Sequence, residues 1–262
     1  MRPASWKQKK PAIKGNERGE VIAEGHTVLT LFDYVFWIGG FILEIFIVLS
    51  SLLRGDFRRY VFLNFYMLFA AFVALGSYIC IHKFGFASPQ YFYYYYYTEG
   101  SLYVLMYLVI IQFYQQVFQE MKVGRYIRQG AALFLVLTAL FSFMVVHRNR
   151  NHLTTPFVVE LEQNLNFVGV VLTYVLWGAI VKLRETRTRL VQLVLALGIY
   201  YSGTAVSCAV DNLFRSNDLK AHVLRWLPPL FGTWLPLAWA YTFTRVPEDA
   251  RTIVSPVLAG ER

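Results

Sequence analysis

Residues 28–53 read VLTLFDYVFWIGGFILEIFIVLSSLL, a run that contains no lysine, arginine or histidine. An α-helix rises about 1.5 Å per residue, so roughly 20 apolar residues cross the hydrocarbon core of a bilayer, which is about 30 Å thick. The run is long enough and apolar enough for one crossing. It therefore predicts a transmembrane helix.

Six further stretches of the chain have the same character. They are residues 60–81, 93–118, 131–146, 157–181, 190–214 and 226–243. All 25 lysines and arginines fall outside the seven stretches, and charged residues make up 16% of the chain, against about 25% in soluble domains. The sequence predicts an all-α polytopic membrane bundle of seven transmembrane helices over residues 28–243. A polar basic tail (1–27) precedes it and a short tail (244–262) follows.

Two of these stretches have the least certain ends. Residues 131–146 are short for a crossing, and residues 226–243 contain three prolines. Pro236 lies in the middle of the last stretch, where it removes a backbone hydrogen bond and predicts a kink.

Basic residues predict the orientation. We call the face that bears the amino terminus the N-face and the opposite one the C-face. The C-face loops hold Arg54, Arg58, Arg59, Lys122, Arg125, Arg128, Lys182, Arg184, Arg187 and Arg189. The N-face loops hold fewer, namely Lys83, Arg148, Arg150, Arg215, Lys220 and Arg225. The positive-inside rule then predicts a cytoplasmic C-face and an external amino terminus.

Five carboxylates inside the stretches lie toward the N-face. They are Asp33, Glu99, Glu160, Glu162 and Asp211. A carboxylate in hydrocarbon is costly and usually faces the bundle interior. All five histidines flank stretches on this face: His26, His82, His147, His152 and His222. The pattern favours a polar N-face cavity for a ligand or protons. Carboxylates and histidines can also bind a divalent metal, but no metal-binding spacing is present, so whether a metal site exists stays open. No cofactor is predicted.

Two of the five carboxylates, a further one at Glu44, and one pair of glycines are interpreted one by one. Glu160 and Glu162 stand in the polar first turns of their stretch, which we expect to project into the headgroup zone. Glu44 lies near mid-membrane, where it acts as a proton-linked switch or bonds to Asn64 or a neighbouring tyrosine. Gly39 and Gly40 favour close helix packing over a hinge.

An aromatic run, residues 91–97, begins the third stretch. Tyrosines gather at membrane interfaces, which favours a simple belt. The run covers every side of a helix, however, so a ligand or partner surface is the alternative reading. That surface would consist of Tyr93, Tyr94, Tyr95, Tyr96 and Tyr97.

The C-face arginines are expected to contact anionic lipid headgroups or a cytoplasmic protein, and not nucleic acid. The candidates are Arg58, Arg59, Arg184, Arg187 and Arg189. Cys80 and Cys208 both lie toward the N-face, and whether they form a disulfide stays open. The oligomeric state is not predicted.

Several membrane chemistries lack their residues. No stretch contains a lysine for a retinal Schiff base or a mid-span histidine for a buried haem. The chain has no G-x-S-x-G, H-E-x-x-H or Walker motif. We therefore assign no catalytic residue and expect a protein that is not an enzyme.

Three segments carry a resemblance to a known group. They are residues 91–102, residues 114–118, and residues 234–241 with the Arg-Val-Pro-Glu that follows at 245–248. They resemble a group of uncharacterised bacterial seven-span integral membrane proteins. The layout is also loosely similar to the seven-span input modules of bacterial sensor kinases. The resemblance implies a multi-pass protein of the bacterial inner membrane.

Two functions follow from these observations. The first is a sensor-like or assembly protein, with a ligand in the N-face cavity and a membrane or cytoplasmic protein bound at the C-face. The second is a proton-coupled carrier in which Glu99, Asp211 and Glu44 form a polar path. We favour the first because the stretches 60–81, 131–146 and 226–243 offer few polar residues for a path.

Overall fold

A computed structural model describes residues 31–86, 88–119, 124–149, 154–185, 187–213 and 227–247. Seven long helices account for most of this part of the chain. They are α1 (Leu31–Leu53), α2 (Val61–Phe84), α3 (Pro89–Val117), α4 (Gly124–Asn149), α5 (Thr154–Leu183), α6 (Thr188–Leu213) and α8 (Leu227–Arg245). The all-helical prediction is confirmed for these residues.

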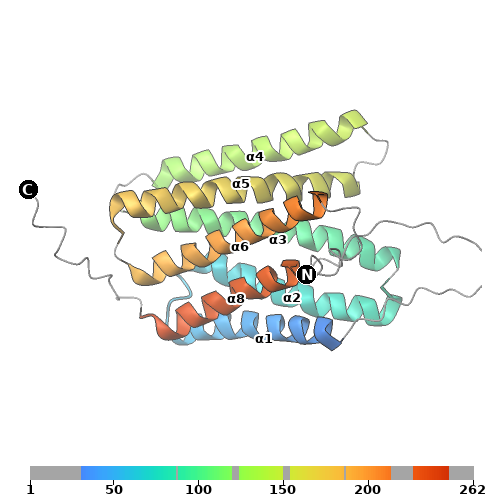
Figure 1. Ribbon diagram of the computed structural model, residues 1–262, viewed down its shortest axis with the longest axis horizontal. Helices are drawn as coiled ribbons and strands as arrows, with labels where there is room; N and C mark the ends of the chain where they lie inside the picture. Colours follow the sequence, from blue (N-terminus) through green and yellow to red (C-terminus); the bar gives the residue numbers. More distant parts are fainter. Residues whose placement is uncertain are drawn as a thin grey trace, which may run out of the picture.

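The helices lie side by side along the long axis of the molecule (Figure 1). Six of them form a closed ring in the order α1, α2, α3, α5, α6, α8, because each packs against the next and α8 packs back on α1. Helix α4 lies outside the ring against α3 and α5. Trp239 of α8 is fully buried, and its indole Nε1 donates to the Leu193 carbonyl of α6 at 3.1 Å.

The outer surface of the bundle is apolar. On α1 the side chains of Val35, Ile38 and Ile42 are more than half exposed, and α4 exposes Leu137 and Phe141 in the same way. A soluble bundle would instead place polar residues outside. Helices α1 to α6 are each long and apolar enough to cross a membrane. The protein is therefore a membrane-embedded helical bundle, with six candidate spans in the described residues.

Helix α8 is not among those six candidates. Three prolines, two tryptophans and three threonines lower its mean hydropathy. Within the ring, Leu235, Trp239 and Phe243 of α8 are buried against neighbouring helices. The helix continues across Pro236 as one element, and the predicted kink stays a prediction.

Several helices are longer than their apolar stretches. The expected short crossing at 131–146 lies within α4, which begins at Gly124 and includes Arg125 and Arg128. Helix α3 begins at Pro89, where the Ser88 side chain accepts a hydrogen bond from the Tyr91 amide. An apolar stretch read from hydropathy stops where basic and polar residues begin. The helix itself continues through those residues.

Glycines at three helix contacts allow close approach, but Gly39 and Gly40 do not take part. A Cβ at either of those two positions would meet nothing within 4 Å, so the expected close packing there is wrong. A Cβ at Gly76 would lie 2.1 Å from the Tyr94 hydroxyl of α3. At Gly169 and Gly203 the added atom would meet the rings of Tyr201 and Phe231 at 2.4 Å and 2.2 Å. The close contacts are thus α2 with α3, α5 with α6, and α6 with α8.

Candidate functional site

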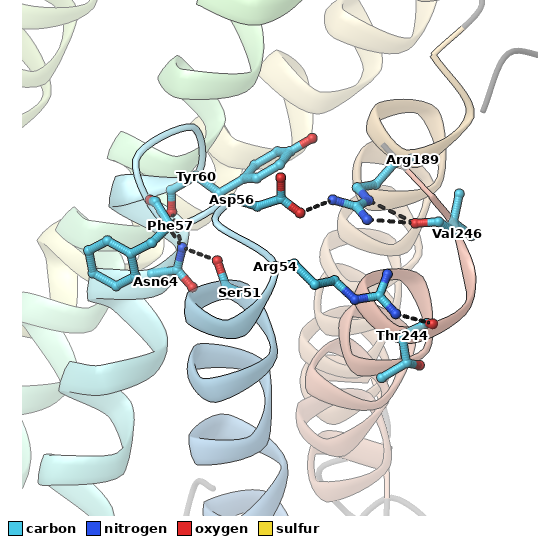
Figure 2. A network of polar contacts seen from close by, with 9 residues as sticks. All are labelled: Ser51, Arg54, Asp56, Phe57, Tyr60, Asn64, Arg189, Thr244 and Val246. Carbon is cyan, nitrogen blue, oxygen red and sulfur yellow. Dashed lines mark hydrogen bonds and ion pairs between the residues drawn. The ribbon is translucent and has the colours of Figure 1, made fainter. Parts of the chain in front are cut away.

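The loop from α1 to α2 is built around Asn64. Its side-chain amide donates to the Ser51 hydroxyl at 2.9 Å and to the Tyr60 carbonyl at 2.8 Å, so one buried group joins both helices (Figure 2). Gly55 has a φ of 75° and closes α1: the Asp56 amide bonds the Ser51 carbonyl and the Gly55 amide bonds the Leu52 carbonyl. This turn fixes the position of the Asp56 carboxylate.

Arg189, at the start of α6, lies buried beside that turn. Its Nη1 donates to Asp56 Oδ2 at 2.5 Å, and its Nε and Nη2 donate to the Val246 carbonyl at 2.9 and 2.7 Å (Figure 2). Its guanidinium also lies 5.6 Å from the centre of the Phe243 ring. Arg54 donates to the Thr244 carbonyl at 2.6 Å. We call this set, Arg54, Asp56 and Arg189 with the last carbonyls of α8, the C-face clamp.

The clamp supplies hydrogen bonds to backbone carbonyls at the end of α8, which have no partner within the helix. The last carbonyls of an α-helix have no partner within the helix, and α8 ends at Arg245. Two guanidinium groups from other elements take the Thr244 and Val246 carbonyls. The end of α8, up to Val246, is therefore held to the α1–α2 turn and to α6.

A second polar group at this end comes from α3. Gln112 Oε1 accepts from the Phe62 and Leu63 amides at the start of α2, and Gln112 Nε2 donates to the Arg59 carbonyl at 2.8 Å. Gln116 Nε2 donates to the same carbonyl at 2.9 Å, while Arg187 donates to the Gln116 backbone carbonyl at 2.7 Å. Gln112 and Gln116 of α3 thus hold the first turn of α2 in place by hydrogen bonds to its backbone.

An open polar groove lies beside these bonds, with a volume of about 470 Å³. Its lining residues are Arg59, Gln112, Gln115, Gln116 and Gln119. Gln116 is 8% exposed, and its Oε1 is buried with no hydrogen-bond partner in the described residues. The groove thus combines a cation, amide donors and one unsatisfied acceptor.

The predicted headgroup-contacting arginines divide into two kinds. Arg58, Arg59 and Arg184 are exposed on the C-face. Arg189 is 1% exposed, which places it inside the protein and differs from the expectation of headgroup contact. Arg187 is partly buried, because it pairs with Glu185 at 2.6 Å as well as with α3.

Glu44 lies on α1 in the membrane-spanning part of the bundle. Its Oε2 is buried and accepts no hydrogen bond from the described residues. The predicted bond to Asn64 is wrong, because the Asn64 amide is used by the α1–α2 turn. The Tyr66 phenol interacts electrostatically with Glu44 and with Glu99. The half-buried Tyr66 thus lies within electrostatic range of one carboxylate from α1 and one from α3.

The N-face cavity stays a prediction. The side chains of Asp33 and Asp211 lie outside the described residues, as do those of His26, His147, His152 and His222. His82 is exposed and stacks on Tyr78 with ring centres 6.1 Å apart. Among the residues that the structure describes, no three histidines, cysteines or carboxylates gather as a metal site. Cys80 is a free thiol, and the Cys208 side chain is outside the described part.

The tyrosine run faces both inward and outward. Tyr93 and Tyr97 are about half exposed, whereas Tyr91 is 9% exposed. The Tyr94 hydroxyl donates to the Val73 carbonyl of α2 at 3.2 Å. Tyr95 and Tyr96 are half-buried in ring contacts with each other and with Tyr91 and Phe92. Part of the run thus holds α2 to α3, and the outward pair is available for a belt or a partner.

Glu162 departs from its expected place in the headgroup zone. It is 7% exposed and lies two turns into α5, which begins at Thr154. Glu160 is half-buried and accepts a hydrogen bond from Asn164, which also donates to Ser142 of α4. Glu160 and Glu162 are thus at least partly covered by the bundle, whereas the neighbouring Gln163 is exposed.

Sequence reasoning missed the glutamines of the groove. Their positions 112, 115, 116 and 119 follow the i, i+3, i+4, i+7 spacing of one helix face, so a polar stripe at the end of the third stretch was a readable signal. It also missed Asp56, for which no local signal exists, because its partner Arg189 is 133 residues away in the chain.

The class of protein that these features define is a membrane-embedded helical bundle with a clamped, polar C-face. Comparisons with family models, with curated proteins and with solved structures give no match.

Proposed function

We propose that this protein is a seven-span integral membrane protein of the bacterial inner membrane that works as a sensor-like or assembly protein and not as an enzyme. The amino terminus is external and the C-face is cytoplasmic, with α8 as the seventh span. Two observations support α8 in this role: it closes the ring between α1 and α6, and its end lies with the C-face turns.

The observation that carries the function is the C-face clamp. It fixes the end of α8 beside a surface where Arg54, Arg58, Arg59 and Arg184 are exposed. An arginine-rich surface favours an acidic partner, and positions fixed before binding lower the ordering cost of association. The partner is accordingly an acidic segment of a membrane or cytoplasmic protein.

Site-specific photo-crosslinking in native membranes tests this function. Photoreactive residues at Arg58 and Arg184 should give one defined adduct. The same residue at Gln90, on the exposed start of α3 at the other end of the bundle, serves as the control and should not give that adduct. A C-face that yields no adduct, or one shared with Gln90, would remove the proposal.

Glu44 favours a second function, a proton-coupled carrier. Its buried and unpartnered Oε2, together with the electrostatic link from Tyr66 to Glu99, puts two ionisable groups in one part of the bundle. In reconstituted vesicles a pH gradient should drive solute or proton flux, and Glu44→Gln should abolish it while preserving shape. Wild-type vesicles without flux would exclude the carrier.

A further inference from the structure

Aromatic side chains line the buried face of α8. The Tyr66 ring of α2 packs edge-on against the Trp239 ring, with ring centres 6.4 Å apart. Phe243 lies one turn beyond Trp239 on the same face, and its ring meets the Tyr60 ring edge-on with centres 5.4 Å apart. Trp239 and Phe243 are both fully buried, and in a close-packed interior neither ring can move without its neighbours. We call Tyr66, Trp239 and Phe243 the α8 aromatic column.

One end of this column meets the C-face clamp. The Arg189 guanidinium lies 5.6 Å from the centre of the Phe243 ring. The same guanidinium donates to the Val246 carbonyl and to the Asp56 carboxylate. A displacement of Phe243 therefore acts on the group that holds the end of α8 to the α1–α2 turn.

The other end of the column lies near a carboxylate inside the membrane-spanning part. Tyr66 is within electrostatic range of Glu44, and Glu44 Oε2 is buried with no hydrogen-bond partner in the described residues. Glu44 as a whole is only partly buried, and a proton needs no cavity of its own. A charge without a partner in hydrocarbon is costly, so a proton gained or lost here changes the forces on nearby side chains more than at a solvated surface.

The titratable groups around Glu44 come from several helices, and α1 packs against α2 and α8. Helix α2 contributes Tyr66, and its other titratable groups lie near the N-face end: Tyr78, Cys80, His82 and Lys83. The titratable groups of α8, Tyr241 and Arg245, are both exposed. Glu99 of α3 and Tyr200 and Tyr201 of α6 lie within electrostatic range of Tyr66. Tyr66 is thus the titratable group through which a change at Glu44 reaches α8.

Building on the sensor-like function above, on which this step rests, we propose that Glu44 is a proton-sensing group and that the α8 aromatic column carries its protonation state to the C-face clamp. The proton enters from water and returns to it, and no other group is transferred. Its gain or loss changes the force on the Tyr66 hydroxyl, Tyr66 then moves against Trp239, and α8 shifts at Phe243. The signal that the sensor detects is therefore the proton concentration.

The arginine-rich C-face surface is where this signal is read. Arg58 is exposed two residues after Asp56, in the turn that the clamp holds. A change in the clamp therefore changes how Arg58 is presented to an acidic partner.

An environment-sensitive fluorophore on Arg58→Cys tests the proposal, in the full chain reconstituted in lipid vesicles with Cys80 and Cys208 replaced by serine. The emission should change when the buffer pH is titrated, and Glu44→Gln should remove this change. Glu160→Gln is the matched control, because it removes a half-buried carboxylate of α5 outside the column, and it should keep the response. An emission that does not change with pH, or that still changes in Glu44→Gln, overturns the proposal.

Two further variants test the route. Tyr66→Phe removes only the hydroxyl group, and Phe243→Leu removes the ring that Arg189 contacts but keeps an apolar side chain. In both, the infrared carbonyl band of the Glu44 carboxyl group, identified by its absence in Glu44→Gln, should still titrate, whereas the fluorophore should no longer respond. If Phe243→Leu fails to fold, Tyr66→Phe decides the matter.

A fluorophore response that survives in Tyr66→Phe, or a wild-type carboxyl band that does not titrate, also overturns the proposal. Failure here is distinguishable from failure of the sensor-like function. A defined crosslinked partner at the C-face, found together with no pH response of the fluorophore, would remove the proton-sensing role and leave the partner-binding function standing.

Discussion

At the residue scale, the role of Arg189 depends on where the fold places it. In the sequence it is one of ten basic C-face loop residues that set topology. In the structure its side chain is 2% exposed and bonded to Asp56 and to the Val246 carbonyl. Arg58 is exposed instead. The pairing could not be predicted, because it joins residues 133 positions apart.

Asp56→Asn should destabilise the protein by about 2–3 kcal/mol, somewhat less than the roughly 3–5 kcal/mol for breaking a fully buried pair, because the Asp56 side chain is 16% exposed. Arg189→Lys should be similarly harmful, since an ammonium lacks the planar fork that serves two acceptors at once. Denaturant unfolding in detergent measures both. Arg58→Gln, an exposed control, should stay within about 0.5 kcal/mol of wild type.

Arg184 offers the opposite change, a gain of stability. It has a φ of 52° at the end of α5, where its amide and that of Glu185 bond the Val181 and Ile180 carbonyls. Glycine adopts this left-handed conformation without strain, so Arg184→Gly should stabilise the fold by about 0.5–1 kcal/mol. Arg184→Ala removes the same side chain but keeps the Cβ. An equal gain from the alanine would show that backbone strain is not the cause.

At the element scale, hydropathy located seven helices but not how they pack. The predicted stretches match α1 to α6 and α8 apart from their ends, because apolar length is a local property. Close packing was assigned to Gly39 and Gly40, whereas Gly76, Gly169 and Gly203 make the close contacts. Which helix face meets a neighbour depends on residues far apart in the chain, so composition alone could not distinguish these glycines.

Gly76→Ala should therefore destabilise the α2–α3 contact by about 1–3 kcal/mol, because its Cβ would overlap the Tyr94 ring. Gly39→Ala, which meets nothing, should be neutral or stabilising by up to about 1 kcal/mol through helix propensity. Thermal unfolding of both variants gives the comparison. Tyr94→Leu should recover part of the loss when it is combined with Gly76→Ala, and no recovery would contradict the close contact.

At the scale of the whole molecule, the ring of six helices with α4 outside places all the described C-face turns at one end. The sequence predicted that end from its arginines, and the apolar surface supports the membrane setting. The clamp and the groove arise only where α1, α2, α3, α6 and α8 meet. A site shared by five helices has no contiguous motif, which is why sequence reasoning looked for function at the N-face.

The account depends most on α8 crossing the membrane as the seventh span. Single cysteines at Ser5 and Gly260, in a chain with Cys80 and Cys208 replaced by serine, report the two ends. A membrane-impermeant maleimide applied to intact cells should label the cysteine at position 5, and should label the one at 260 only after the membrane is permeabilised. Labelling of both in intact cells, or of neither, would place the two termini on one side and contradict seven spans.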